Sequence, residues 1–194
     1  MENTPRQTKI NKVVKNRQEG VIVLEDIHDP YNAAAVWRSC EAFGFQKVNI
    51  IFEQEKEFDP KRLGKATSAS ANKWLDFKIF KSTKTCIDEL KKDGYGIYAT
   101  VLDKEANNLQ SIDFKRKKIA VIFGNEHRGL SETAINMADE KIYIPMKGMV
   151  QSLNLSVTAA IVMYEINRQR KNGNYQLSIE EKADLIKRFS TRVK

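Results

Sequence analysis

The chain has 194 residues, which suits one domain with extensions, and its 41% hydrophobic and 30% charged residues are typical of a soluble globular protein. No apolar run reaches the ~18 residues that span a bilayer, and the first residues lack the apolar core of a secretory signal, so we expect a cytoplasmic protein that does not bind membranes. The two cysteines, Cys40 and Cys86, fit neither a disulfide framework nor a metal motif, so we expect buried thiols and no metal.

The net charge of +8 is concentrated at the two ends of the chain. Residues 1–18 hold five basic side chains and one acid, and residues 164–194 hold eight basic and four acidic side chains. Each end therefore carries +4, and the residues between them sum to zero. A neutral body with basic ends favours a polyanion bound by the ends, although solvated helix faces would give the same pattern.

The first element expected is an N-terminal helix, because Thr4, Pro5 and Gln7 are typical of a helix start and Gly20 of an end. Strands and helices then alternate. The expected strands cover residues 21–25, 47–52, 76–80, 96–101, 118–123 and 141–145. The expected helices begin at Asn32, near Thr83, at Ser131, near Ser152 and after a capping box of Ser178 and Glu181. Polar residues 53–73 indicate a functional loop or short helices.

This alternation predicts an α/β fold with a mainly parallel sheet. We expect one domain over residues 19–171. A basic helical arm over residues 1–18 would precede it, and an amphipathic basic helix over residues 172–194 would follow it.

Three polar segments follow expected strands and are the candidate functional regions: residues 28–39, 122–132 and 144–156. Open α/β sheets bind ligands at the carboxyl ends of their strands, so these segments should meet at one edge. The sequence contains no G-x-S-x-G, no P-loop and no G-x-G-x-x-G motif. Those absences argue against a nucleophile-elbow hydrolase, a P-loop NTPase and a dinucleotide-binding oxidoreductase.

The three segments resemble the three motifs of the SpoU/TrmH family of RNA 2′-O-methyltransferases, which belongs to the SPOUT class. The motifs are NAAAVWR (32–38), GNEHRGL (124–130) and IPMKGMVQSLNLS (144–156), and the resemblance extends over residues 21–170. With basic arms on both sides, the chain is most similar to the TrmH subgroup, whose members methylate guanosine 18 in the tRNA D-loop.

The resemblance implies a deep trefoil knot in the C-terminal part of the sheet, S-adenosylmethionine bound in that knot, and an obligate homodimer paired through residues 152–168 and 28–40. The cofactor-binding residues that it implies lie in the loops after the strands: Thr100, Leu102, Gly124, Asn125, Glu126, Ile144, Met146, Ser152 and Leu153. The catalytic residues that it implies are Arg38, Asn32, Ser152 and Asn154.

The expected reaction is methylation of a ribose 2′-hydroxyl in tRNA. Arg38 would either take the hydroxyl proton or, as we prefer, hold a phosphate and stabilise the developing alkoxide, because guanidinium groups stay protonated at neutral pH. The expected RNA contacts are Arg6, Lys9, Arg17, Arg38, Arg128, Arg168 and Arg170. Two alternatives stay open here: the same reaction on rRNA or another tRNA position, and a catalytically idle RNA-binding assembly factor. The motif assigns no role to His127.

Overall fold

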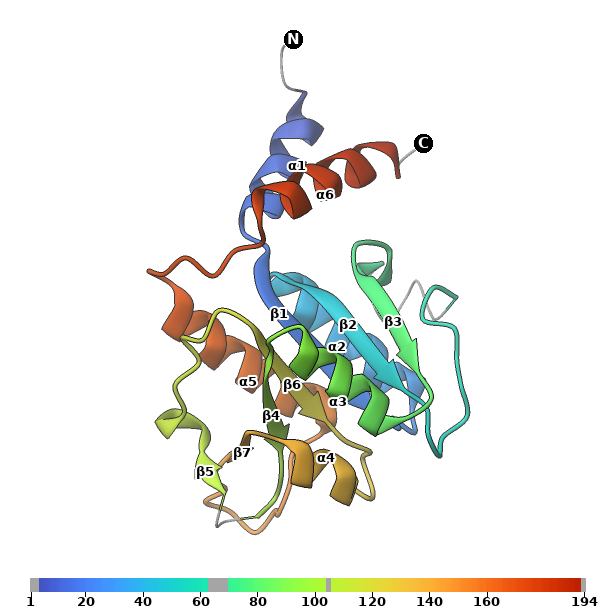
Figure 1. The fold of residues 1–194 in the computed structure, drawn as a ribbon, viewed down its shortest axis with the longest axis vertical. Coiled ribbons are helices and arrows are strands. Elements are labelled where there is room, and N and C mark those ends of the chain that lie inside the picture. The colour runs from blue at the N-terminus through green and yellow to red at the C-terminus, as the bar shows by residue number, and fades with distance from the viewer. Residues whose placement is uncertain (1–3, 63–69, 104–105, 193–194) are drawn as a thin grey trace.

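The computed structural model describes residues 4–62, 70–103 and 106–192 and contains one seven-stranded sheet in the order β3-β2-β1-β6-β4-β7-β5 (Figure 1). All strand pairs in the sheet are parallel, so the predicted α/β class with a mainly parallel sheet is confirmed. The strands are β1 (Gln18–Glu25), β2 (Phe45–Ile51), β3 (Asp76–Phe80), β4 (Gly96–Thr100), β5 (Asn107–Asn108), β6 (Ile119–Phe123) and β7 (Glu140–Tyr143).

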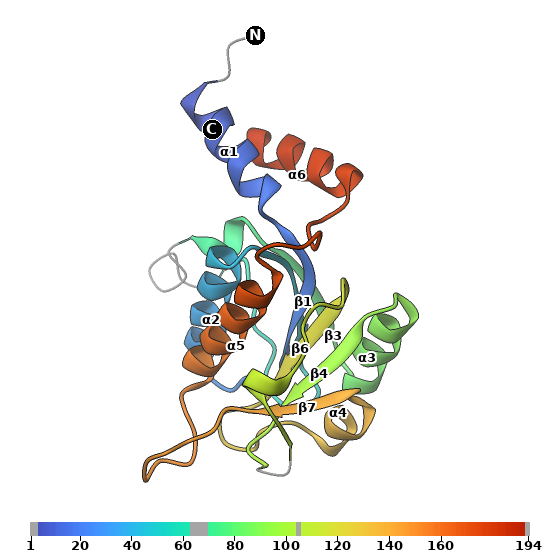
Figure 2. The same cartoon turned by 90° about the vertical axis from the view of Figure 1, so that its left-hand side faces the viewer.

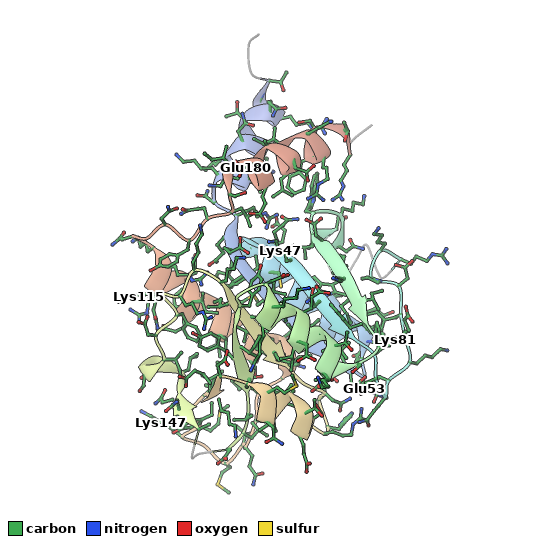
Figure 3. The ribbon with its side chains drawn as sticks, in the orientation of Figure 1. Lys47, Glu53, Lys81, Lys115, Lys147 and Glu180 are labelled. Carbon is green, nitrogen blue, oxygen red and sulfur yellow. The ribbon has the colours of Figure 1, made fainter. Side chains whose placement is uncertain are left out.

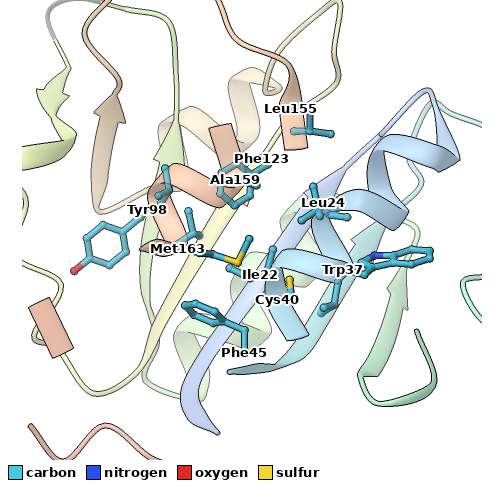
Figure 4. Packing of buried hydrophobic residues seen from close by; sticks show 14 of the residues in the cluster. Ile22, Leu24, Trp37, Cys40, Phe45, Tyr98, Phe123, Leu155, Ala159 and Met163 are labelled. Carbon is cyan, nitrogen blue, oxygen red and sulfur yellow. The ribbon is translucent and has the colours of Figure 1, made fainter. Parts of the chain in front are cut away.

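Two helix pairs cover the two faces of the sheet (Figure 2). On one face lie α2 (Pro30–Ala42) and α5 (Leu155–Arg170), and on the other lie α3 (Thr83–Lys92) and α4 (Glu132–Met137). The inner strands are buried on both sides, which is why they are apolar runs rather than alternating sequences. In Figure 4, Trp37 and Cys40 of α2 and Met163 of α5 pack on Ile22 and Phe45.

Both cysteines are free and buried, as expected. Burial raises the pKa of the Cys86 thiol to about 12 and also raises the pKa of Cys40. Neither thiol is therefore a ready nucleophile at neutral pH.

The helix boundaries differ from prediction at three places. The N-cap of α2 is Asp29, whose carboxylate accepts from the amide of Tyr31, so Asn32 lies inside the helix. The N-cap of α5 is Asn154 rather than Ser152. Helix α1 (Pro5–Lys15) ends before Gly20, because the chain has already entered β1, where the amide of Gln18 bonds the carbonyl of Gly44. The capping box of Ser178 and Glu181 is confirmed.

The two terminal helices, α1 and α6 (Ile179–Thr191), pack against each other beyond the amino ends of β1 to β3 (Figure 1). They share a small apolar core formed by Ile10, Val14, Leu177, Leu185 and Phe189. Arg188 of α6 forms a two-pronged ion pair with Asp76, at 2.6 and 2.9 Å. Burial raises the pKa of Asp76, but hydrogen bonds and the charge of Arg188 lower it overall, so the pair is ionised at neutral pH.

A second ionic contact fixes α6 to the sheet. Lys47 lies at the junction between the terminal helices and the sheet (Figure 3), where its ammonium group donates to Glu181 at 2.8 Å and to Glu19 at 3.1 Å. The basic C-terminal helix is thus held on the body by its own charges.

Within the expected loop over 53–73, residues 71–73 form the short helix η1 (Ala71–Lys73), and residues 63–69 lie outside the described part. The outermost residues of the two expected arms, 1–3 and 193–194, also lie outside it. A second short helix, η2 (Leu109–Ser111), follows β5. No helix in the described residues is long and apolar enough to cross a membrane.

Candidate active site

Glu126 joins the second polar segment to the first. Its carboxylate accepts hydrogen bonds from the amides of His28 (2.9 Å) and Asp29 (3.3 Å) and from the side-chain amide of Asn32 (2.9 Å). The two backbone donors lie just before α2, where unpaired amides and the helix dipole favour an anion. Burial raises the pKa of Glu126, but these hydrogen bonds lower it overall, so the group is an anionic acceptor rather than a base at neutral pH.

Asn154 joins the third segment to the other two. Its side-chain amide donates to the side-chain oxygen Oδ1 of Asn32 at 3.2 Å. Its own oxygen accepts from the amide and hydroxyl of Ser156, at 2.8 and 2.6 Å, and so caps α5. One chain of hydrogen bonds, Glu126–Asn32–Asn154, therefore connects all three segments, as their placement after the strands predicted.

We expect Asn154→Asp to separate the two tasks of this side chain. Aspartate is as good a helix cap as asparagine, so unfolding stability should stay within about 0.5 kcal/mol of wild type. It cannot donate to Asn32, however, and places a carboxylate oxygen against the side-chain oxygen of Asn32. Catalytic turnover should then fall by about tenfold, because one hydrogen bond is lost and the repulsion between the two oxygens displaces Asn32. Equal turnover at equal stability would mean that the Asn32–Asn154 contact has no functional role.

A cavity lies beside this chain of hydrogen bonds, between the loops after β4 and β7 and the start of α5. Five of the predicted cofactor-binding residues line it: Thr100, Leu102, Ile144, Met146 and Leu153. The remaining lining residues are Val101, Leu109, Ile142, Tyr143, Thr158 and Val162. The cavity measures about 30 Å³, far below the ~300 Å³ of a small-molecule site, so a ligand of nucleoside size would have to separate these loops.

The other predicted cofactor-binding residues do not line this cavity. Asn125 is buried, and its side chain donates to the carbonyl of Asp26 (2.7 Å) while accepting from the amides of His127 (2.8 Å) and Arg128 (3.1 Å). A Cβ on Gly124 would lie 2.4 Å from the carbonyl of Gly129, so only glycine fits there. These residues shape the loop, and Ser152 lies exposed at the approach to α5.

Residues 19–164 match the SpoU rRNA methylase family, which is three quarters of the chain. This chain belongs to the SpoU rRNA methylase family. It is 36% identical to the tRNA (guanosine(18)-2′-O)-methyltransferase of Thermus thermophilus over 88% of this chain and 86% of that protein. It is 33% identical to the protein of the same name from Escherichia coli K12, over 90% of this chain and 75% of that protein.

Solved structures give the same assignment. The crystal structure of the Aquifex aeolicus TrmH/SpoU tRNA modifying enzyme superposes with a TM-score of 0.86 at 28% identity, covering 97% of this chain and 98% of that one. The SpoU family match excludes α1 and α6, whereas this structural similarity includes nearly the whole chain.

Two acidic residues in the SpoU site were not predicted from the sequence. Asp26 adopts a left-handed backbone (φ 50°), and its carboxylate accepts from the amides of residues 53, 54 and 55, at 2.8 to 3.1 Å. Glu55 in that turn accepts from Arg128 (2.8 Å), His28 (3.2 Å) and Asn125 (3.2 Å). The available signal was an acid shortly after each of two neighbouring strands, since Asp26 directly follows β1 and Glu55 lies four residues after β2. The residues that these acids bind are distant in sequence.

Arg38 is not part of the Glu126–Asn32–Asn154 chain. It lies six residues after Asn32 on α2, which is about 9 Å along the helix axis. Its side chain is exposed and has no hydrogen bond or ion pair to any residue of the described ranges. Arg38 instead lines a second cavity together with Arg6 and Lys9 of α1.

The prediction that Arg17 and Arg170 contact RNA is wrong, because both side chains are buried. The Arg17 guanidinium is 0% exposed and donates to the carboxylate of Glu41 at 3.1 Å. Arg170 is 4% exposed and donates to the carbonyls of Phe114 (2.9 Å) and Glu19 (2.7 Å). Arg168 and Arg128 remain about half exposed and pair with Glu165 and Glu55 respectively.

Proposed function

We propose that this SpoU methylase transfers a methyl group from S-adenosylmethionine to the 2′-hydroxyl of guanosine 18 in tRNA. The observation that carries the proposal is the Glu126–Asn32–Asn154 chain beside a cavity lined by five predicted cofactor-binding residues. The names of the relatives from Thermus thermophilus and Escherichia coli supply the nucleotide. A cytoplasmic location accords with a tRNA substrate.

The residues around the cavity fit an adenosine-type cofactor. Once the loops separate, Leu102, Ile144, Met146 and Leu153 would provide apolar walls for a purine. Thr100 donates to the carbonyl of Ile122 at 2.9 Å and so fixes the end of β4 against β6. When bound, the cofactor supplies an electrophilic methyl group on a sulfonium.

Arg38 meets the chemical need on the RNA side. A ribose hydroxyl attacks only as its proton leaves, and a fixed cation beside it stabilises the developing alkoxide. Since no carboxylate pairs with Arg38 in the part of the chain described, its planar donors are available to a phosphate and a ribose oxygen. Because Arg38 lies about 9 Å from Asn32 along α2, we infer that Arg38 and the Glu126–Asn32–Asn154 chain of one subunit do not form a single active site.

A homodimer would complete it. Helices α2 and α5 present an exposed apolar face with Tyr31 (61% exposed), Tyr164 (59% exposed) and Val157. A shallow hollow in the same face is lined by Ala35, Ser39, Ser156, Val157, Ala160, Ile161 and Tyr164. Exposed apolar patches of this kind mark protein interfaces. Pairing through this face would bring Arg38 toward the partner's cofactor cavity.

We further propose the division into an arm over residues 1–18, a methyltransferase domain over 19–171 and a C-terminal helix over 172–194, with a trefoil knot in the domain. The strand order supports the knot. Strand β6 lies between β1 and β4, and after β7 the chain crosses to the opposite face to place α5 beside α2 (Figure 2).

The function is tested by transfer of labelled methyl from S-adenosylmethionine to an unmodified tRNA transcript. We expect one methyl per tRNA, located at the ribose of nucleotide 18, and no transfer to a transcript with a 2′-deoxyguanosine there. Transfer to rRNA or to an anticodon nucleotide instead would correct the substrate. Binding of tRNA without transfer to any RNA would support the idle alternative.

The dimer is tested by Val157→Glu, which places a carboxylate in the apolar face. We expect the variant to sediment as a monomer and to lose methyl transfer, because an unpaired buried charge costs several kcal/mol at an interface. Ile179→Glu is the matched control, because Ile179 is also an exposed apolar residue but lies on α6. A wild-type protein that is an active monomer would contradict the proposal.

A further inference from the structure

The cavity that contains Arg38 lies between the terminal helices and the end of α2, and it measures about 530 Å³. That volume is within the range of small-molecule sites. It is lined by Arg6, Lys9, Ile10 and Val13 of α1, Arg38, Glu41 and Ala42 of α2, Ala71, Trp74 and Phe189. The cavity is thus formed where the helices outside the SpoU family match meet the motif-one helix.

The floor of this cavity is apolar and aromatic. Ile10 and Val13 form one side, and the partly exposed ring of Trp74 forms another. Trp74 and Phe189 pack in a T-shaped arrangement, with ring centroids 5.0 Å apart. This contact restrains the indole, which is one of the aromatic side chains that line the cavity. A planar group such as a nucleobase would gain stacking energy here.

The rim of the cavity is cationic. Arg6, Lys9 and Arg38 contribute three positive charges, and Glu41 is the only acid among the described residues that line the cavity. The carboxylate of Glu41 is already bound by the buried Arg17 guanidinium at 3.1 Å, which neutralises it. The lining is therefore complementary to a ligand that combines an aromatic plane with a negative charge.

We propose that this cavity binds an unstacked nucleotide of the RNA substrate, with the base on Trp74 and its phosphate between Lys9 and Arg38. The proposal rests on the proposed function for the nature of the substrate and extends it with a binding site outside the cofactor cavity. Sequence-specific enzymes read RNA through splayed loop nucleotides stacked on aromatic side chains, so a nucleotide held here would place its ribose-phosphate backbone at Arg38.

Trp74 provides a direct reporter, because the chain has two tryptophans and Trp37 is fully buried in the core. In a Trp37→Phe variant, Trp74 is the sole emitter. We expect an unmodified tRNA transcript to quench its fluorescence and to shield it from acrylamide, in the absence of S-adenosylmethionine. Trp74→Leu should weaken tRNA binding by about 5- to 150-fold, the loss expected for one base stack.

Because Trp74→Leu also disturbs the contact with Phe189, a charge reversal at the rim is the second test. We expect Lys9→Glu to weaken tRNA binding about tenfold and Lys12→Glu, on the same exposed helix but outside the cavity, to weaken it about threefold or less. Unchanged acrylamide access to Trp74 in the tRNA complex, or equal losses for the two lysines, would overturn the nucleotide site. Methyl transfer by the wild-type protein would still stand in that case, so the two proposals fail separately.

Discussion

Replacing Arg38 by alanine is expected to lower the rate of methyl transfer by about 100- to 1,000-fold, the loss found when one preorganised donor to a developing oxyanion is removed. Arg38 is exposed in the first motif, and no group in the described residues pairs with its guanidinium. We therefore expect the guanidinium to bind the RNA at the reacting ribose. The affinity for S-adenosylmethionine should stay within about twofold, since Arg38 does not line the cavity proposed to bind the cofactor. Single-turnover assays with saturating tRNA and calorimetry of cofactor binding measure the two quantities.

Arg38→Lys separates the charge of the side chain from its geometry. A lysine retains the charge but not the planar donor fork. We therefore expect the lysine variant to bind tRNA as wild type does and to react at a rate near that of the alanine variant. Arg62→Ala is a control for loss of an exposed arginine, since the Arg62 side chain is 89% exposed and pairs with Asp59. A lysine variant with near-wild-type turnover would mean that Arg38 acts only as a point charge on phosphate.

Arg170→Met is expected to destabilise the fold by at least about 3 kcal/mol, because it leaves several buried carbonyl groups without a donor. The guanidinium donates to the carbonyls of Phe114, Glu19, Arg116 and Lys117 and to the side chain of Gln18. It thereby fixes the end of α5 to β1 and to the loop before β6. Burial lowers the pKa of Arg170 to about 10, so the group remains charged at neutral pH.

Arg168→Met is the matched control for this prediction. Arg168 is two residues away on the same helix and is 59% exposed, and among the described residues it pairs with Glu165. Unfolding stability should therefore change by less than about 1 kcal/mol. Denaturant unfolding curves for the two variants and wild type make the comparison. If the Arg170→Met protein were as stable as wild type but bound tRNA more weakly, Arg170 would contact RNA after all, contrary to its buried position in the structure.

Local sequence patterns determined much of the architecture. Strands of apolar residues and helices with caps are properties of short segments, so the strand at 76–80, the helix at 83–92 and the Ser178–Glu181 box could be located without knowledge of the fold. The three polar segments could be assigned to one edge for a similar reason, since parallel strands place their carboxyl ends together. The convergence of Asn32, Glu126 and Asn154 followed from that rule and from the motifs.

The tasks of individual charged side chains were decided only by the tertiary structure. Arg168 and Arg170 are equivalent in a charge count, yet one is exposed and the other is buried against carbonyls more than fifty residues away. Asp26 and Glu55 acquire their roles from partners on three separate loops, which no local pattern encodes. The position of Arg38 in a cavity lined by residues of α1 and α6 depends on packing between the two ends of the chain. Burial and long-range pairing arise only when distant segments are brought together. The sequence alone therefore determined which residues are charged, but not which of these residues are exposed to solvent.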